Sequence, residues 1–261
     1  MNDKFNILST KALEPAIIKM AGKLGFRIDE KAFIEVQYLE GNEIASEWKK
    51  ICDLPQKKLL VFTSKNAVEA IISTIDSDDT TKVSRNSIVE SWPIASISGR
   101  TMETVQKEFP HARTFAIAKN ADQLGKAISE NISKEYLVVF PCGDIHRPEL
   151  PEHLRSEGFI VNEWIVYRSV KTPVKIQNAY QGILFFSPSA VESFFSVNKL
   201  HPETICFAVG ATTAQSVKRF SANHLFVTEN PSQESMLELM ETYFIDRNNN
   251  ELLGKNKNEG K

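Results

Sequence analysis

Hydroxyl-bearing turns are the residues of this sequence whose types and spacing could do chemistry. The stretch "LLVFTSKNAVEAII" (59–72) is an apolar run that breaks at residues 63–66 and resumes with helical spacing. The stretch "GILFFSPSAVESFF" (182–195) breaks in the same way at residues 187–190. Serine and threonine at such breaks accept hydrogen bonds from the free N–H groups of the first helical turn, which carries the positive end of the helix dipole. Each turn could therefore cap its helix, bind an anion, or do both. The candidate binding residues in these two turns are Thr63, Ser64, Lys65, Asn66, Ser187, Pro188, Ser189 and Ala190.

Two turns that contain glycine repeat this pattern. "WPIASISGRTMETVQKEF" (92–109) and "TICFAVGATTAQSVKRF" (204–220) both pass from an apolar run through glycine to threonine and then into a helical pattern. Glycine lets a ligand approach the backbone closely, and successive N–H and O–H donors form anion-binding concavities. Helix capping explains any single turn, whereas the cluster of such turns favours an anion site. The candidate binding residues here and at the start of the last expected helix are Gly99, Arg100, Thr101, Gly210, Thr212, Thr213 and Ser232.

The turns belong to a repeat that covers most of the chain. Four blocks occur in the order A, B, C, D and then again in the same order. The blocks are A (5–37 and 136–168), B (59–72 and 182–195), C (92–109 and 204–220) and D (112–130 and 222–240). This order indicates duplication of a half of about 130 residues and not a short-period solenoid.

Short apolar runs alternate with helical stretches in both halves. The runs at 59–63, 136–140, 182–186 and 205–209 are apolar apart from Thr63, which is typical of strands buried on both faces. Strands that alternate with helices form parallel sheets, and parallel sheets bind ligands outside the carboxyl ends of their strands. The sequence therefore predicts an α/β fold with two small doubly wound parallel-sheet domains, and the hydroxyl-bearing turns fall at the ligand-binding edge. We expect residues 73–87 and 169–180 to be linkers.

The composition limits the kind of partner. The 261 residues, 42% of them hydrophobic, can bury one large core or two ordinary ones. The net charge of -2 provides no overall field that would attract nucleic acid or an anionic membrane, so an anionic ligand must be bound locally. The start of the chain lacks the charged segment followed by an apolar segment that is typical of a secretory signal. No apolar run approaches the roughly 20 residues of a membrane span. We therefore expect a cytoplasmic protein with no membrane or nucleic-acid partner.

The sequence lacks the motifs that are typical of several other kinds of functional site. Cys52, Cys142 and Cys206 are far apart and are expected to be reduced thiols. The five histidines show no H-E-x-x-H spacing, so no metal site is expected. Neither glycine-rich nucleotide fingerprint is present. Ser187 lacks the flanking glycines of a hydrolase nucleophile elbow.

An ordered set of motifs resembles the uroporphyrinogen-III synthase family. The set runs from Ile7 to about Tyr243 and comprises "VFTSKNAVEA", "SGRTMETV", "LPEHLRSEGFIVNEWIVYRS", "FFSPSAVESF", "FAVGATTAQSV" and "NPSQESMLELM". The resemblance implies two α/β domains joined by a pair of extended connectors, with no metal or organic cofactor. It also implies the reaction, in which the linear tetrapyrrole hydroxymethylbilane loses its terminal hydroxyl, ring D is inverted, and the macrocycle closes to uroporphyrinogen III. The substrate's carboxylates would suit the predicted donor turns.

The resemblance further implies how the halves are exchanged between the domains. Residues 1–37 are expected to join residues 171–246 in a discontinuous first domain, and residues 42–165 to form the inserted second domain. The polar tail 247–261 is expected to be disordered. We also expect a monomer.

The resemblance bears on four further residues. A tyrosine at the position of Tyr167 is the family's favoured candidate for assisting departure of the hydroxyl, although packing alone would also explain an aromatic residue there. Thr10 and Lys11 correspond to a Thr-Arg-Pro motif, so that the basic contact here would be an ammonium and not a guanidinium fork. Met102 stands where the family has a threonine, which weakens the first block C as a hydroxyl donor.

Two other functions remain open on the sequence alone. Duplicated α/β lobes also suit a non-catalytic binding protein for a small polyanionic ligand, or a transferase that uses a nucleotide sugar. The family resemblance also implies a further partner. The enzyme that makes the unstable hydroxymethylbilane could pass it to this protein by transient contact.

Overall fold

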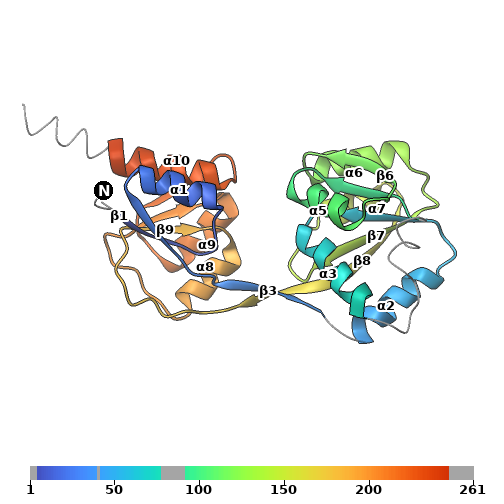
Figure 1. Cartoon of the computed structure of the whole chain (residues 1–261), viewed down its shortest axis with the longest axis horizontal. Helices are drawn as coiled ribbons and strands as arrows, with labels where there is room; N and C mark the ends of the chain where they lie inside the picture. The colour runs from blue at the N-terminus through green and yellow to red at the C-terminus, as the bar shows by residue number, and fades with distance from the viewer. Residues whose placement is uncertain (1–4, 40–41, 78–91, 247–261) are drawn as a thin grey trace, which may run out of the picture. The chain divides into compact units, whose positions relative to one another are not determined.

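The computed structural model describes residues 5–39, 42–77 and 92–246, so the predicted tail 247–261 lies outside the described residues. The chain forms two compact units. Unit 1 holds the described residues up to Glu35 and those from Val170 onward, and unit 2 holds those from Val36 to Ser169. Each unit is a sheet covered by helices (Figure 1).

Unit 1 is built on a parallel sheet in the order β11-β10-β9-β1-β2. Its strands are β1 (Phe5–Ser9), β2 (Phe26–Glu30), β9 (Gly182–Phe185), β10 (Ile205–Ala208) and β11 (Leu225–Val227). Its helices are α1 (Pro15–Lys23), α8 (Pro188–Phe195), α9 (Ala211–Phe220) and α10 (Gln233–Glu241), followed by a π-helical turn η1 (Thr242–Asp246).

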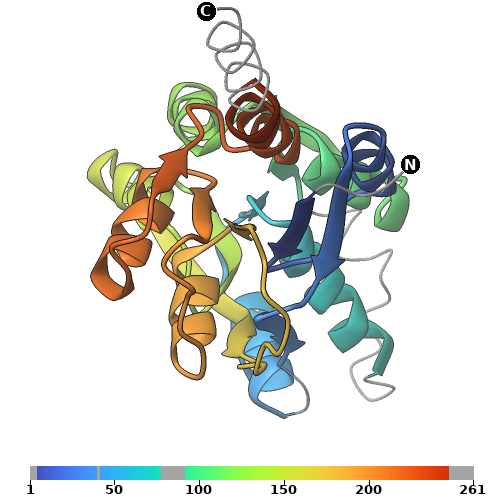
Figure 2. The same cartoon turned by 90° about the vertical axis from the view of Figure 1, so that its left-hand side faces the viewer.

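Both faces of this sheet are buried, as the apolar runs predict. Because successive strand side chains point to opposite faces, Leu184 of β9 packs with α1 and α10, whereas Ile183 and Phe185 pack with α8 and α9. The two helix layers are visible on opposite sides of the sheet (Figure 1 and Figure 2). The predicted α/β class with parallel sheets is confirmed.

Unit 2 has the strand order β3-β8-β7-β4-β5-β6. Its strands are β3 (Ile34–Tyr38), β4 (Lys58–Phe62), β5 (Ile94–Ile97), β6 (Thr114–Ala118), β7 (Leu137–Gly143) and β8 (Ile160–Lys171). Its helices are α2 (Asn42–Asp53), α3 (Lys65–Ser77), α5 (Arg100–Glu108), α6 (Ala121–Asn131) and α7 (Glu149–Ser156). Helices α2, α3 and α5 cover one face, and α6 and α7 cover the other.

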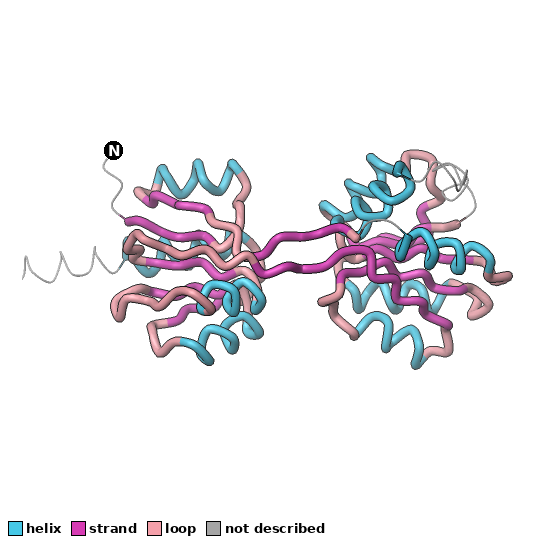
Figure 3. Tube along the Cα trace, turned by 90° about the horizontal axis from the view of Figure 1, so that it is seen from below, coloured by secondary structure: helices cyan, strands magenta, loops and turns pink. Residues whose placement is uncertain are grey.

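The chain passes between the units along β3 and β8, which are neighbours in one sheet. The amide of Leu39 donates to the carbonyl of Val166 at 3.0 Å, and the amide of Thr172 donates to the carbonyl of Phe33 at 3.0 Å. Figure 3 shows these two strands side by side where the chain passes from one unit to the other.

The sequence repeat is visible in the strand orders. In unit 1, β1 and β2 from the first block A lie beside β9, β10 and β11 from the second blocks B, C and D. In unit 2, β7 and β8 from the second block A lie beside β4, β5 and β6 from the first blocks B, C and D. Each sheet therefore combines block A of one half with blocks B, C and D of the other half.

The two expected linkers are partly regular, which corrects that interpretation. Helix α3 continues to Ser77, since a helix that has already nucleated extends at little cost into polar residues. Strand β8 continues to Lys171 because it pairs along its length with its neighbours in the sheet. Residues 78–87 lie outside the described part of the chain.

The three cysteines are free thiols, and two of them are buried. Burial raises the pKa of Cys142, which also lies near the Glu163 carboxylate, to about 12, and burial raises the pKa of Cys206 to about 12. Cys52 is half-buried, and its pKa is also raised by burial. In the described ranges, no helix has both the length and the apolar character needed to cross a membrane.

We expect a thiol reagent at pH 8 to label Cys52 first in the native protein. Only the thiolate reacts, and both access and ionisation are suppressed at Cys142 and Cys206. Counting modified thiols against time, before and after unfolding in denaturant, measures this difference. Rapid labelling of all three cysteines in the native protein would contradict the buried placement.

Candidate active site

The predicted turns of unit 1 follow neighbouring strands at one edge of its sheet. Ser187 precedes α8 and its hydroxyl accepts from the amide of Ala190 at 3.1 Å. Ser232 precedes α10 and accepts from the amide of Ser235 at 3.0 Å. Gly210 occupies the equivalent position before α9 but has no side chain to cap that helix. The carboxyl ends of β9, β10 and β11 therefore each lead into a helix N-terminus along one edge.

The hydroxyls of this edge are not equally accessible. Thr10 is 2% exposed, and its Oγ1 donates to the carbonyl of Leu184 at 2.8 Å, so this group fastens the end of β1 to β9. Thr213 is also buried, whereas Thr212 beside it is exposed. Lys11 is exposed, and its Nζ lies 4.4 Å from the ring centroid of Phe186. Exposed donors at this edge thus lie beside buried hydroxyls, one of which, on Thr10, joins two strands.

The predicted turns of unit 2 follow β4 and β5, which are also neighbours. Ser64 ends the β4 turn, and its Oγ accepts from the amide of Asn66 at 3.2 Å. Gly99 begins α5 with a φ of 74°, a left-handed conformation that favours glycine. Arg100 is exposed at the first position of α5, whereas the Thr101 side chain is buried.

Tyr167 and Ser64, 103 residues apart in the sequence, meet at this edge. The phenol of Tyr167 donates to the hydroxyl of Ser64 at 3.2 Å, and Tyr167 is 8% exposed. The meeting depends on a register shift between β7 and β8, at which Cys142 pairs with Ile165 but Gly143 pairs with Tyr167. The structure thus brings the predicted catalytic residue to a predicted binding turn within unit 2.

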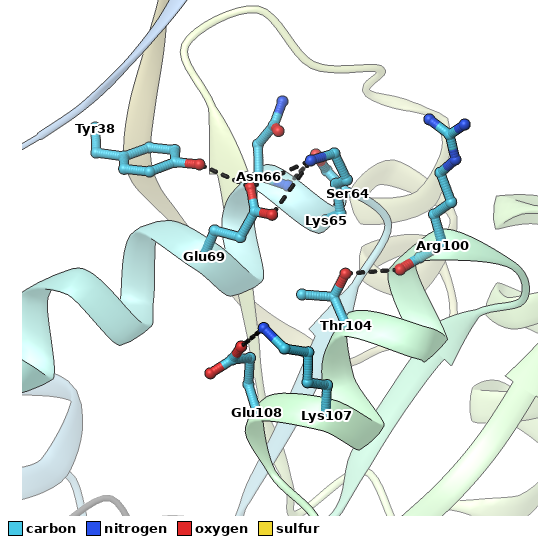
Figure 4. A network of polar contacts seen from close by, with 9 residues as sticks. All are labelled: Tyr38, Ser64, Lys65, Asn66, Glu69, Arg100, Thr104, Lys107 and Glu108. Carbon is cyan, nitrogen blue, oxygen red and sulfur yellow. Dashed lines mark hydrogen bonds and ion pairs between the residues drawn. The ribbon is translucent and has the colours of Figure 1, made fainter. Parts of the chain in front are cut away.

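Two residues of this region, Tyr38 and Glu69, were not anticipated from the sequence. The phenol of Tyr38, on β3, donates to Oε2 of Glu69 at 2.7 Å, and Nζ of Lys65 lies 3.2 Å from Oε1 of the same carboxylate (Figure 4). Burial, the hydrogen bond to Glu69 and the negative charge of Glu69 raise the pKa of Tyr38 to about 12, with a further contribution from Tyr167. Tyr38 therefore stays a protonated donor across the physiological range.

The sequence does contain one signal for this network. Lys65 and Glu69 are four residues apart on one helix, a spacing that places them on the same face. Lysine at the first position of a helix opposes the helix dipole, so its placement there points to an anionic partner. Nothing in the sequence pattern indicates that Tyr38 joins them, because it comes from a different segment.

The arrangement can bind carboxylates and donate hydrogen bonds. The turns of each unit combine helix N-termini, hydroxyls and one or two basic side chains, which together suit negatively charged oxygen ligands. A phenol with an ordinary pKa near 10 is protonated at neutral pH and can donate a proton to a leaving oxygen.

The chain matches known proteins over most of its length. The family model described as "Uroporphyrinogen-III synthase HemD" matches residues 16–238. The crystal structure of uroporphyrinogen-III synthetase from Helicobacter pylori 26695 is similar at 19% identity with a TM-score of 0.64, covering 92% of this chain and 98% of that one. A mutant uroporphyrinogen III synthase from the extremely thermophilic bacterium Thermus thermophilus is similar at 14% identity with a TM-score of 0.55, covering 91% of this chain and 97% of that one.

These structural likenesses concern the fold, since both identities are low. The family match is the stronger finding because it spans both units and every block of the repeat from α1 to α10. The duplicated α/β units, their exchanged blocks and this match together make the chain a member of the uroporphyrinogen-III synthase family.

Proposed function

We propose that this chain is a hydro-lyase that converts hydroxymethylbilane to uroporphyrinogen III with loss of water and inversion of ring D. The observation that carries the proposal is the hydrogen bond between Tyr167 and Ser64 in a member of this family. It joins the one predicted proton donor to a turn that is suited to bind a substrate carboxylate.

The substrate is a tetrapyrrole, and its carboxylates are the groups that the turns would bind. In unit 1 these turns follow β9, β10 and β11, and in unit 2 they follow β4 and β5. Backbone N–H groups supply most of the donors, so binding does not depend on any one side chain. Lys11, Lys65 and Arg100 add positive charge at exposed positions of the same edges.

The chemistry asks for orientation more than for reactive side chains. Departure of the hydroxyl leaves a cation that the pyrroles themselves stabilise, and Tyr167 would donate the proton that the leaving oxygen needs. The protein must then hold the linear chain so that ring D attacks through its substituted position. Such positioning is worth several powers of ten in rate when the reacting atoms are held in place.

The direct test supplies hydroxymethylbilane enzymatically and separates the products. We expect type III uroporphyrinogen as the main product, formed faster than the type I isomer that closes spontaneously. Type I alone, at the rate seen without the protein, would overturn the proposal.

A single hydroxyl deletion in the donor turns should have a small effect. We expect Ser187→Ala or Ser232→Ala to lower kcat/KM by less than about tenfold, because one hydrogen bond is worth about 0.5–1.5 kcal/mol net and the backbone amides remain. Ser196→Ala is the matched control, since its hydroxyl bonds to the carbonyl of Ser193 near the other end of α8. Loss of all turnover in Ser187→Ala at an unchanged melting temperature would require a specific catalytic role for that hydroxyl.

The remaining expectations from the sequence stay predictions. They are a monomeric state, a cytoplasmic location, the domain limits, and transient contact with the enzyme that makes the bilane.

A further inference from the structure

His146 lies in the turn after β7 with both ring nitrogens facing oxygen atoms. Nδ1 is 2.9 Å from the carbonyl oxygen of Gly143, and Nε2 is 2.5 Å from Oε2 of Glu163. The carbonyl can only accept, and Oε1 of the same carboxylate lies 2.6 Å from the Arg155 guanidinium. Only the imidazolium donates from both nitrogens, so the geometry assigns a proton to each.

The charges around His146 agree with a positive ring. The titratable and charged groups near it are Glu163 on β8, Arg155 on α7, Cys142 near the end of β7, and Asp144 and Arg147 in its own turn. Burial opposes ionisation of Glu163, yet the hydrogen bonds from Arg155 and His146 and their charges outweigh it and lower the pKa of this carboxyl. Phe140 of β7 contributes only an uncharged ring, 5.8 Å away between centroids.

The turn that His146 fastens is the one against which Tyr167 packs. A Cβ atom at Gly143 would lie 2.4 Å from Cε2 of Tyr167, so ring and backbone are in close contact. The amide of Asp144 donates to the carbonyl of Tyr167 at 3.1 Å, and the Asp144 side chain accepts from the amide of Ser169 at 3.0 Å. The position of the Gly143 backbone therefore limits where the Tyr167 ring can lie.

We propose that His146, as the imidazolium, is a positioning residue for Tyr167: it ties the carbonyl of Gly143 to Glu163 and so holds the phenol toward Ser64. The proposal deepens the proposed synthase function and rests on it for the role of Tyr167. Neutral imidazole carries one N–H group, so deprotonation removes one of the two bonds and loosens the turn. Positioning is therefore present while both ring nitrogens are protonated, and it is lost when rising pH removes one of the two protons.

The first measurement is the protonation state itself, which needs no enzymatic activity. Histidine-labelled protein is titrated by NMR, and the His146 signals are identified by their absence in His146→Asn. We expect both ring nitrogens to carry protons at pH 7, because each of them faces an acceptor oxygen. A neutral His146 ring at pH 7 would overturn the proposal.

The second measurement compares two variants in the bilane assay. His146→Leu removes both hydrogen bonds, and we expect kcat to fall about tenfold to a hundredfold with KM nearly unchanged, because the phenol is misplaced. His146→Asn keeps an amide donor for the Gly143 carbonyl but cannot titrate. Because one of the two bonds is kept, we expect its kcat to lie between those of His146→Leu and the wild type and to show no alkaline decline.

The control is His111→Asn, the same change at an exposed histidine of unit 2, which should leave both the rate and its pH profile unchanged. Equal kcat in wild type and His146→Leu would contradict a positioning role, even if His146→Leu melts at a lower temperature. Absence of type III product from the wild type would instead count against the proposed function, and the NMR titration would still report on His146.

Discussion

Replacing Tyr167 by phenylalanine is expected to lower the rate of type III formation by at least about tenfold while leaving the melting temperature nearly unchanged. The ring keeps its packing against Gly143, and only the hydroxyl that donates to Ser64 is lost. A positioned general acid typically contributes about 10² to 10⁴ in rate, and the described part of unit 2 offers no second phenol bonded to Ser64. The measurement is kcat for type III product at saturating bilane.

Tyr180→Phe is the matched control for this change. Tyr180 is also 8% exposed, and its phenol donates to Asp29 at 2.8 Å in unit 1. This variant also loses one buried phenol bond, so its stability should fall at least as much, whereas its activity should stay near that of the wild type. Wild-type activity in Tyr167→Phe would return Tyr167 to the packing role that the sequence left open.

Gly143→Ala is expected to damage both the fold and the site. The added methyl would lie 2.4 Å from Cε2 and 2.7 Å from Cζ of Tyr167, well inside van der Waals contact. Either β7 or the tyrosine must move, and overpacking of this kind typically costs about 1–3 kcal/mol of unfolding free energy. Because the displaced group is the phenol itself, we expect activity to fall by more than the loss of stability alone would cause.

Gly22→Ala provides the contrast for this substitution. Gly22 lies in α1 with no neighbouring atom within 4 Å of the added Cβ, so alanine there should stabilise the protein by about 0.5–1 kcal/mol. Denaturant unfolding of the two variants and the wild type measures both effects. A Gly143→Ala protein with unchanged stability and activity would show that the Tyr167 ring is free to move aside.

The sequence by itself determined the local elements and the edge at which function is expected. The apolar runs at 59–63 and 182–186 predict strands buried on both faces, and β4 and β9 lie there. Hydroxyl residues after these strands cap the helices that follow, as Ser187 does for α8. These features depend on neighbours in the chain and on burial, so composition and spacing suffice to predict them.

The sequence also pointed to both partners of the central hydrogen bond, but not to the bond itself. Ser64 came from the turn pattern and Tyr167 from the family resemblance. Their contact requires β7 and β8 to pair with a shift at Gly143, which no local pattern in the sequence records. Tyr38 was missed for the same reason, since its carboxylate partner Glu69 lies on another element.

The residue pattern by itself leaves open which block A completes which sheet, and only the family resemblance implied the exchange. The two copies of block A are similar, and both begin with a largely buried strand, β1 or β7, so either could add to β4 or to β9 by its local character. The structure places β1 beside β9 and β7 beside β4. The physical reason is that strand pairing across a sheet uses backbone hydrogen bonds common to all residues, so partner choice is set by how the whole chain packs.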